Sequence, residues 1–287
     1  MKVLITGGSG QCGSALVALP HDKILFDREK RPDNLSHSQF IQGDLGDTNI
    51  LIKALEGCDA VIHLAAASKI NSSWDDVLKE NIKGTNNILE AARMTGVERV
   101  IFASSNHVVG MYELEHAPEI YELGHKHMLT QDVTVRPDSL YGVSKVFGEN
   151  LGRFYAENGG PKFYAIRIGA LVHEDHPYAH AERGVISREW ERNSPQYNLQ
   201  VKRLKSLWIS KRDFVQLINH CLYYDGPDYD SFYAVSNNPR RWLDIEHPRK
   251  KLGYEPQDNA EEWLSPPQLD TTIAKTPGKR ISEQIKR

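Results

Sequence analysis

The chain has 287 residues, of which 25% are charged, and its formal net charge is −3 at pH 7. This balance creates no positive field for nucleic acid, and no apolar run approaches the roughly 18 residues that span a bilayer, so neither nucleic acid nor a membrane is an expected partner. The sequence opens on MKVLITGG without a charged and then apolar leader, and its three cysteines are far apart. These features predict a cytoplasmic protein with reduced thiols.

The opening residues carry the pattern of a nucleotide-binding loop. An apolar strand, KVLIT, leads into glycines at Gly7, Gly10 and Gly13, and an amphipathic helix pattern follows. Glycine permits a tight turn and a close approach to a pyrophosphate, while the helix N-terminus favours the negative charge of the phosphates. A glycine motif alone is weak evidence, but its position between a strand and a helix strengthens it.

The second strand pattern, KILFD, ends in an acid that bears on cofactor choice. Asp27 lies twenty residues after Gly7, where a dinucleotide-binding fold places an acid on the adenosine ribose. A carboxylate there repels a 2′-phosphate, so the spacing favours NAD over NADP. Arg28 and Arg31 follow closely and oppose this prediction, because an arginine can accept that phosphate.

Strand and helix patterns then alternate along the chain. FIQGDLGD gives a short strand that ends at Asp44, CDAVIHLAAA an apolar strand, and ERVIFASSN a fifth strand that ends at Ser105. A long helix is expected over residues 73–96, closed by a glycine, and KFYAIRIGA is the sixth strand. This alternation predicts an α/β fold with a doubly wound parallel sheet, the Rossmann arrangement, in which ligands bind at the carboxyl ends of the strands.

The stretch SLYGVSKVFGEN, residues 139–150, places Tyr141 four residues before Lys145. On a helix the two side chains share one face, and an ammonium beside a phenol lowers the phenol pKa from its usual value of about 10. The pair therefore predicts a general base that works near neutral pH, whereas the alternative is a tyrosine and a lysine on an ordinary half-exposed helix. Four polar residues stand at the end of the fifth strand: Ser104, Ser105, Asn106 and His107.

Together the glycine loop T-G-G-x-G-x-x-G, the acids at the strand ends, the serine of S-x-x-V-x-G and Y-x-x-x-K resemble an extended short-chain dehydrogenase/reductase. The resemblance is to the NAD-dependent epimerase/dehydratase branch and covers about residues 1–264. In such enzymes the serine holds the substrate oxygen, the tyrosine exchanges its proton, and the lysine lowers the tyrosine pKa and binds the nicotinamide ribose. The resemblance implies these roles for Ser105, Tyr141 and Lys145.

We predict the other contacts on the same basis. The predicted NAD-binding residues are Gly7, Gly10, Gln11, Cys12, Gly13, Asp27, Arg28, Asp44, Leu45, Leu64, Ala65, Ala66, Asn81, Ser104, Tyr141, Lys145 and Ile168. The predicted substrate-binding residues are Ser68, Ser105, Asn106, His107, Tyr141 and Arg203. No metal is expected, because the loop histidines match no closed tetrahedral pattern with the cysteines.

Two subgroups of the family share further motifs with this chain. LYGVSKVFGENLGR, LWISKRDF and LGYEPQDNAEEW resemble uronate dehydrogenases, and SSWDDVLKENIKGTNN resembles the haloarchaeal-type NAD-dependent glucose-6-phosphate dehydrogenases. Both groups oxidise C1 of a free hexose derivative to the lactone, and both substrates carry an anion at C6. The resemblance to the uronate enzymes implies that Arg203 binds this anion. An arginine fork suits a carboxylate, but the neighbouring Lys202 and Lys205 suit a phosphate at least as well, so the sugar stays open between hexuronate and hexose 6-phosphate.

The predicted organisation has three parts. Residues 1–170 form the NAD-binding Rossmann domain with the catalytic residues, and 171–264 form a small substrate-binding part with interleaved Rossmann elements. Within that part, 173–202 is expected to be a lid over the active-site mouth, and 265–287 is a polar tail. A homo-oligomer is common for this fold.

Two other functions fit the sequence less well. A nucleotide-sugar epimerase needs a larger C-terminal part for a nucleotide diphosphate, and Asn106-His107 stands where dehydratases of this superfamily carry an Asp-Glu pair. A non-catalytic NAD-sensing protein would not need a serine, tyrosine and lysine that are all intact.

Overall fold

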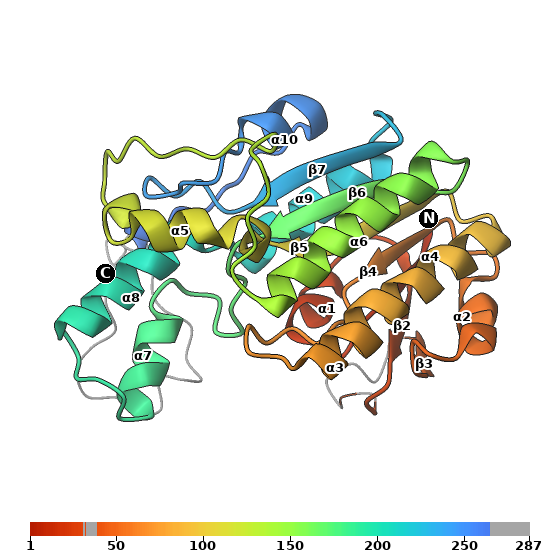
Figure 1. Cartoon of the computed structure of the whole chain (residues 1–287), viewed down its shortest axis with the longest axis horizontal. Coiled ribbons are helices and arrows are strands. Elements are labelled where there is room, and N and C mark those ends of the chain that lie inside the picture. The colour runs from red at the N-terminus through yellow and green to blue at the C-terminus, as the bar shows by residue number, and fades with distance from the viewer. Residues whose placement is uncertain (31, 33–38, 265–287) are drawn as a thin grey trace, which may run out of the picture.

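Seven parallel strands form one sheet in the order β3-β2-β1-β4-β5-β6-β7 (Figure 1). The structure is a computed structural model that describes residues 1–30, 32 and 39–264, so Arg31 and the predicted tail 265–287 lie outside the described residues. The strands are β1 (Lys2–Thr6), β2 (Asp22–Asp27), β3 (Gln39–Gln42), β4 (Ala60–His63), β5 (Arg99–Ser105), β6 (Lys162–Ile168) and β7 (Tyr229–Ala234). The predicted α/β class and doubly wound parallel sheet are confirmed.

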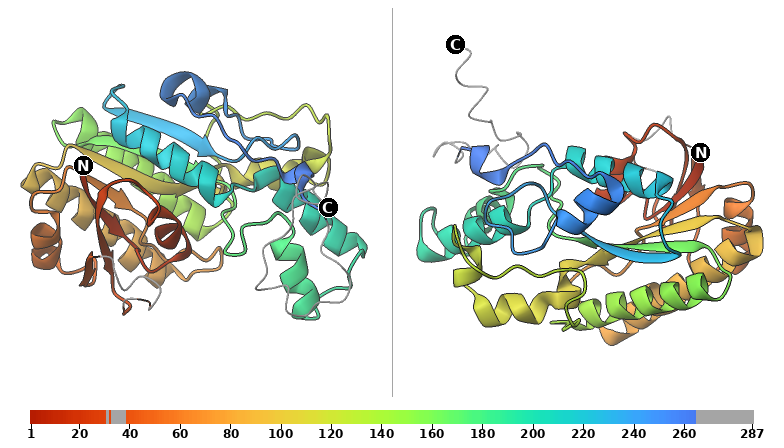
Figure 2. Two further views of the ribbon diagram at one scale, coloured as in Figure 1. Left: turned by 180° about the vertical axis from the view of Figure 1, so that it is seen from behind. Right: turned by 90° about the horizontal axis from the view of Figure 1, so that it is seen from above.

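Helices cover both faces of the sheet, as the two views of Figure 2 show. The α-helices are α1 (Gln11–Leu16), α2 (Thr48–Leu55), α3 (Trp74–Asp76), α4 (Gly84–Thr95), α5 (Gly110–His116), α6 (Leu140–Glu157), α7 (Ala179–Ile186), α8 (Pro195–Leu207), α9 (Lys211–Tyr223) and α10 (Glu246–Leu252). One face carries α1 and α9, and the other carries α2, α4 and α6. Alternate strand residues feed the two layers: Leu25 packs under α1 and α9, whereas Ile24 packs against α2 and α4. No helix within the described residues is long and apolar enough to cross a membrane.

The predicted long helix over 73–96 is present but irregular. A π-helical turn, Val77–Lys83, joins α3 to α4, and the helix ends at Gly96, which adopts a left-handed conformation (φ 72°). The turn contains Asn81, whose amide donates to the Ser144 hydroxyl (2.8 Å) and pairs with the backbone of Ala67. The irregular turn therefore ties the segment after β4 to α6.

Two long connections between elements of the sheet layer contain helices. The predicted lid, 173–202, holds α7 and the start of α8, which begins after its N-cap Ser194. The connection between β5 and α6 holds α5 and a 3₁₀ turn, Glu119–Tyr121. In Figure 1, α5, α7 and α8 stand together beyond the end of the sheet.

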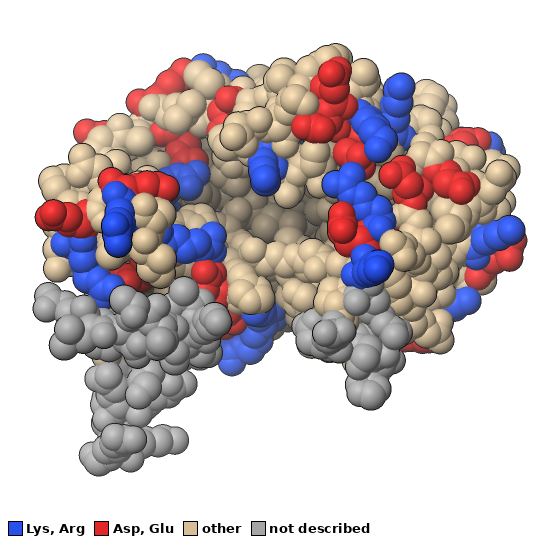
Figure 3. Space-filling model, turned by 90° about the horizontal axis from the view of Figure 1, so that it is seen from below, with Lys and Arg blue, Asp and Glu red and all other residues tan. Residues whose placement is uncertain are grey.

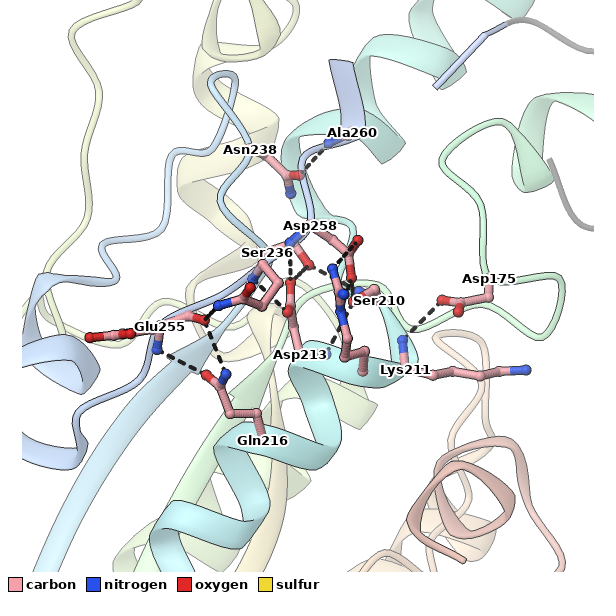
Figure 4. A network of polar contacts seen from close by, with 12 residues as sticks. Asp175, Ser210, Lys211, Asp213, Gln216, Ser236, Asn238, Glu255, Asp258 and Ala260 are labelled. Carbon is pink, nitrogen blue, oxygen red and sulfur yellow. Dashed lines mark hydrogen bonds and ion pairs between the residues drawn. The ribbon is translucent and has the colours of Figure 1, made fainter. Parts of the chain in front are cut away.

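A buried polar network fastens the segment after α10 to the sheet layer (Figure 4). Asp213, near the start of α9, is fully buried and accepts hydrogen bonds from the Ser236 hydroxyl (2.6 Å) and from the backbone N–H groups of Gln257 (2.8 Å) and Asp258 (3.1 Å). Burial raises the pKa of the Asp213 carboxyl. β7 and α9 thus belong to the sheet and its cover although they lie in the segment 171–264, which supports interleaved Rossmann elements there.

Candidate active site

Two adjoining pockets lie at the carboxyl ends of the strands, on the hollowed face that Figure 3 shows. The first pocket, of about 350 Å³, follows the turn after β1 and the ends of β2 and β3. The second pocket, of about 280 Å³, lies between β5, β6, α6 and α8. Four residues line both pockets, namely Cys12, Leu64, Ala66 and Ser68. A ligand that fills the first pocket therefore reaches the second.

The glycine loop forms the floor of the first pocket. Gly7 has a φ of +69°, and a Cβ added there would come within 2.8 Å of the backbone nitrogen of Ala65. A Cβ at Gly13 would come within 2.5 Å of the Gly7 carbonyl oxygen, so α1 packs directly on the loop. Only glycine fits at these two positions, and the first residues of α1, Gln11 and Cys12, line the pocket. The residues present fit the pyrophosphate of a dinucleotide.

Asp27 closes the far end of the first pocket at the end of β2. Its carboxylate accepts hydrogen bonds from the backbone N–H groups of Ser9 (2.9 Å) and Glu29 (3.1 Å), which hold it beside the glycine loop. The neighbouring Arg28 is paired with Glu80, with 2.9 Å between Nη1 and Oε1. Because a carboxylate already holds Arg28, this side chain is a poorer partner for a 2′-phosphate than the sequence suggested.

Most of the predicted binding residues line one of the two pockets. The exceptions are Gly13, which lies beneath the loop, and Asn81, which is buried and holds backbone instead. The first pocket contains Gly7, Gly10, Gln11, Cys12, Asp27, Arg28, Asp44, Leu45, Leu64, Ala65, Ala66 and Ser68. The second contains Ser104, Ser105, Asn106, His107, Tyr141, Lys145, Ile168 and Arg203, besides the four residues that line both.

Ser105, Tyr141 and Lys145 meet in the second pocket. Ser105 ends β5, and the other two lie one turn apart near the start of α6, which begins after its N-cap Ser139. The Lys145 ammonium nitrogen lies 5.6 Å from the centre of the Tyr141 ring and 4.8 Å from that of Phe102. A hydroxyl, a phenol and an ammonium therefore face one small space.

The pKa values of this group differ from the prediction. Burial raises the pKa of Tyr141 to about 12, although interaction with the Ser105 hydroxyl lowers it. Burial likewise lowers the pKa of Lys145 to about 8. The prediction that Lys145 brings the Tyr141 pKa below its usual value is wrong for the protein alone, because desolvation of the phenol is the larger effect.

A buried ion pair supports the catalytic helix. Glu149, one turn after Lys145, pairs with Arg167 of β6 through both of its oxygens (3.0 and 2.9 Å), and both side chains are about 95% buried. Glu149 also accepts a hydrogen bond from the Ser104 hydroxyl (2.5 Å). Ser104 thus lines the second pocket while its hydroxyl is directed at Glu149 rather than at a ligand.

His107 has a partner that the sequence did not reveal. Its Nδ1 lies 2.7 Å from a carboxylate oxygen of Asp138, which also accepts from the Ser139 hydroxyl (2.9 Å). The His107 ring meets the Tyr141 ring edge-on, with 5.9 Å between the centres. The Asp138 carboxylate favours a proton on Nδ1 of His107 and so fixes the orientation of the ring. Thirty-one residues separate His107 from Asp138, and no local motif links them.

Arg203 lies at the far end of the second pocket, but the two lysines beside it do not line the pocket. The ammonium of Lys202 pairs with Glu122 (2.5 Å), and that of Lys205 pairs with Glu261 (3.1 Å). Lys202 and Lys205 therefore add no positive charge to the pocket lining that would favour a phosphate, since neighbours on a helix point in different directions. The predicted lid, 173–202, also supplies His180 to the wall of the pocket, a residue that no sequence motif marked as part of the site.

A dinucleotide cleft that opens into a pocket with a serine, a tyrosine and a lysine is the arrangement of a short-chain dehydrogenase/reductase, and this defines the class of the protein. Residues 3–215 match the NAD dependent epimerase/dehydratase family. The chain belongs to this family, and the predicted relationship is confirmed.

Individual relatives resemble the chain over nearly its whole length. It is 36% identical to the NAD-dependent glucose-6-phosphate dehydrogenase of Haloferax volcanii, over 91% of this chain and 95% of the relative. It is 32% identical to the uronate dehydrogenase of Agrobacterium fabrum, over 91% and 86%. A crystal structure of a variant uronate dehydrogenase from Agrobacterium tumefaciens complexed with NAD superposes with a TM-score of 0.71, at 29% identity, over 96% of this chain and 97% of that one.

Proposed function

We propose that this protein is an NAD-dependent dehydrogenase that oxidises C1 of a free hexose derivative, a hexuronate or a hexose 6-phosphate, to the lactone. The observation that carries the proposal is the meeting of Ser105, Tyr141 and Lys145 in a small pocket that adjoins the cleft for a dinucleotide. The two sugar dehydrogenases with which it shares about a third of its sequence support the substrate class. A screen for NADH formation over hexuronates, hexose 6-phosphates and uncharged hexoses tests it.

The residues of the second pocket divide the reaction between them. Ser105 holds the oxygen on C1, and Tyr141 takes the proton of the C1 hydroxyl as a carbonyl forms. NAD, when bound, accepts the hydride from C1. The ammonium of Lys145 favours the phenolate form of Tyr141, and a bound oxidised nicotinamide would add a second positive charge to the same effect. The products are the lactone, the reduced cofactor and one proton, which Tyr141 releases. Positioning of sugar and cofactor in one dry pocket supplies much of the rate effect.

NAD is expected to bind more tightly than NADP. Asp27 stands where the adenosine ribose is expected, and its charge repels a 2′-phosphate, while Glu80 engages Arg28. Asp27→Asn should weaken NAD binding by about 10- to 150-fold, since a hydrogen bond to a charged group is worth about 1.5–3 kcal/mol. The same variant should reduce the preference for NAD over NADP. Fluorescence titration with both cofactors measures this, with Asp22→Asn, at the other end of β2, as the control. Equal affinity of the wild type for both cofactors would contradict the assignment.

The rival functions are less well supported by the second pocket. Its volume of about 280 Å³ suits a single hexose, whereas a nucleotide-sugar epimerase must hold a sugar and a nucleotide diphosphate. A non-catalytic NAD sensor has no need of a serine, tyrosine and lysine that share one pocket. A signal in the NADH screen would exclude the sensor.

We propose that the protein is a cytoplasmic homo-oligomer, with an interface on α6. Four apolar side chains of this helix, Leu140, Val143, Phe147 and Phe154, are 39–59% exposed along one side, and α6 runs across the front of the sheet in Figure 1. Such a stripe is typical of an interaction surface. Sedimentation should give a dimer or larger for the wild type and a monomer for Phe147→Glu/Phe154→Glu. Tyr223→Glu, on the opposite layer, serves as control; a monomeric wild type would contradict the proposal.

A further inference from the structure

Arg203 is held by a buried carboxylate that no part of the catalytic scheme requires. Its Nε and Nη2 lie 2.6 and 3.2 Å from the two oxygens of Glu113 on α5. The Glu113 side chain is only 4% exposed and also accepts a hydrogen bond from the Tyr121 hydroxyl (2.7 Å). Arg203 lines the second pocket, whereas Glu113 does not. Glu113 therefore holds one edge of the guanidinium from outside the pocket lining.

The two hydrogen bonds to Glu113 determine which edge of the Arg203 guanidinium can bind a ligand. Glu113 uses Nε and Nη2, and the guanidinium also interacts with the Tyr121 hydroxyl. Glu113 does not use the edge formed by Nη1 and the second hydrogen of Nη2, and Arg203 itself lines the pocket. Two parallel N–H groups of this kind match the two oxygens of a planar carboxylate.

Glu113 also removes most of the positive charge from this end of the pocket. Lys202 and Lys205 are paired with their own carboxylates, and neither lines the pocket. His180, also in the wall, is neutral at pH 7, because burial lowers its pKa to about 4. Arg203 and Glu113 together carry no net charge, so a second negative charge on a ligand meets little further attraction and the repulsion of Glu113. A phosphate monoester carries about −1.5 to −2 at pH 7, whereas a carboxylate carries −1.

We propose that Glu113 is a specificity-determining residue, and that it makes the second pocket select a single planar carboxylate at C6, a hexuronate, over a hexose 6-phosphate. The inference rests on the proposed C1 oxidation and chooses between its two substrate classes. Glu113 acts through Arg203: it presents the free edge of the guanidinium and limits the charge that the pocket accepts.

The test compares kcat and KM for a hexuronate, the corresponding hexose 6-phosphate and the uncharged hexose. Wild type is expected to favour the hexuronate in kcat/KM by about 10- to 100-fold, the range of one charge-assisted contact. Glu113→Gln keeps the shape and one acceptor oxygen but removes the charge. It should lower KM for the 6-phosphate by about 10-fold with kcat little changed, and so narrow the preference, because the doubly charged substrate gains more from the freed guanidinium.

Two control variants distinguish the effect of the Glu113 charge from a structural effect of the substitution. Glu113→Asp keeps the carboxylate and should keep the preference. Glu115→Gln removes a carboxylate from the same helix, but one that is 41% exposed and paired with Arg136, and it should leave the ratio unchanged. Arg203→Ala is a poorer test, since it would leave Glu113 buried without its partner.

Each result has a distinct meaning. A wild type that prefers the 6-phosphate or the uncharged hexose overturns the inference while C1 oxidation stands, and this holds even if Glu113→Gln fails to fold. The inference is also overturned if Glu113→Gln folds and its ratio of kcat/KM between the hexuronate and the 6-phosphate equals that of the wild type. If no sugar yields NADH with the wild type, the proposed function itself fails.

Discussion

Tyr141→Phe is expected to reduce kcat by about 100- to 10,000-fold, the usual range for loss of a general base, while the Kd for NAD changes little. The phenyl ring keeps the packing of the Tyr141 ring against His107 and under the Lys145 ammonium, so only the proton acceptor is lost. Single-turnover kinetics with the best sugar of the screen, together with a NAD titration, measure the two effects separately.

Lys145→Ala provides the contrast to this variant. The lysine is predicted both to favour the phenolate and to bind the nicotinamide ribose, so its loss should reduce turnover and weaken NAD binding together. Lys83→Ala, a lysine at the end of the π-helical turn outside both pockets, should alter neither quantity. If Tyr141→Phe keeps wild-type turnover, another residue is the base and the assignment of this pocket fails.

The parts of the site that were predictable from the sequence are those that local patterns encode. Asp27, Asp44 and Ser105 lie at or just after strand ends, and strands that are parallel bring those ends to one edge. Tyr141 and Lys145 follow from the helical spacing of one turn. These residues could be assigned together because the order of the strands along the chain already determines which edge they share.

The residues that were missed interact across long sequence separations. Glu113 meets Arg203 across 90 residues, and Asp138 meets His107 across 31. Both carboxylates lie in the long connection between β5 and α6, where the sequence shows no period. Lys202 and Lys205 were considered as partners for a phosphate because they stand beside Arg203 in the chain. Had the segment been recognised as a helix, the 100° between neighbours would have shown that they face elsewhere.

Asn81 illustrates a different limit. The pattern around it predicted a helix, and a helix is present, but one extra residue in the turn rotates the side chains that follow. Its amide consequently binds Ser144 and the backbone of Ala67 instead of reaching a pocket. Hydrophobic periodicity predicts the existence of a helix far better than it predicts a π-helical turn within it.

The second large effect is expected from the buried ion pair beneath the catalytic helix. Arg167→Met should destabilise the protein by about 3–5 kcal/mol, because it leaves the buried Glu149 carboxylate with the Ser104 hydroxyl as its remaining hydrogen-bond donor and removes the bond from Arg167 to the Gln131 carbonyl (3.0 Å). Urea denaturation with a two-state fit, at a pH where carboxylates are ionised, measures the free energy of unfolding. The matched control is Arg153→Met on α6: its pair with Glu157 is more than half exposed, so its loss should amount to less than about 1 kcal/mol.

A double variant distinguishes the loss of the contact between Glu149 and Arg167 from the effect of an unpaired buried charge on Glu149. Glu149→Leu/Arg167→Met replaces both partners with apolar side chains, and paired removal of a buried ion pair is often neutral or stabilising. We therefore expect the double variant to regain most of the stability that Arg167→Met loses. If it is as unstable as Arg167→Met, the pair itself, with its link to β5 through Ser104, contributes to stability, and the charge left on Glu149 is not the cause. If Arg167→Met costs no more than Arg153→Met, the interior around Glu149 is less dry than its burial indicates, and Lys145 one turn away should then titrate nearer to its usual pKa.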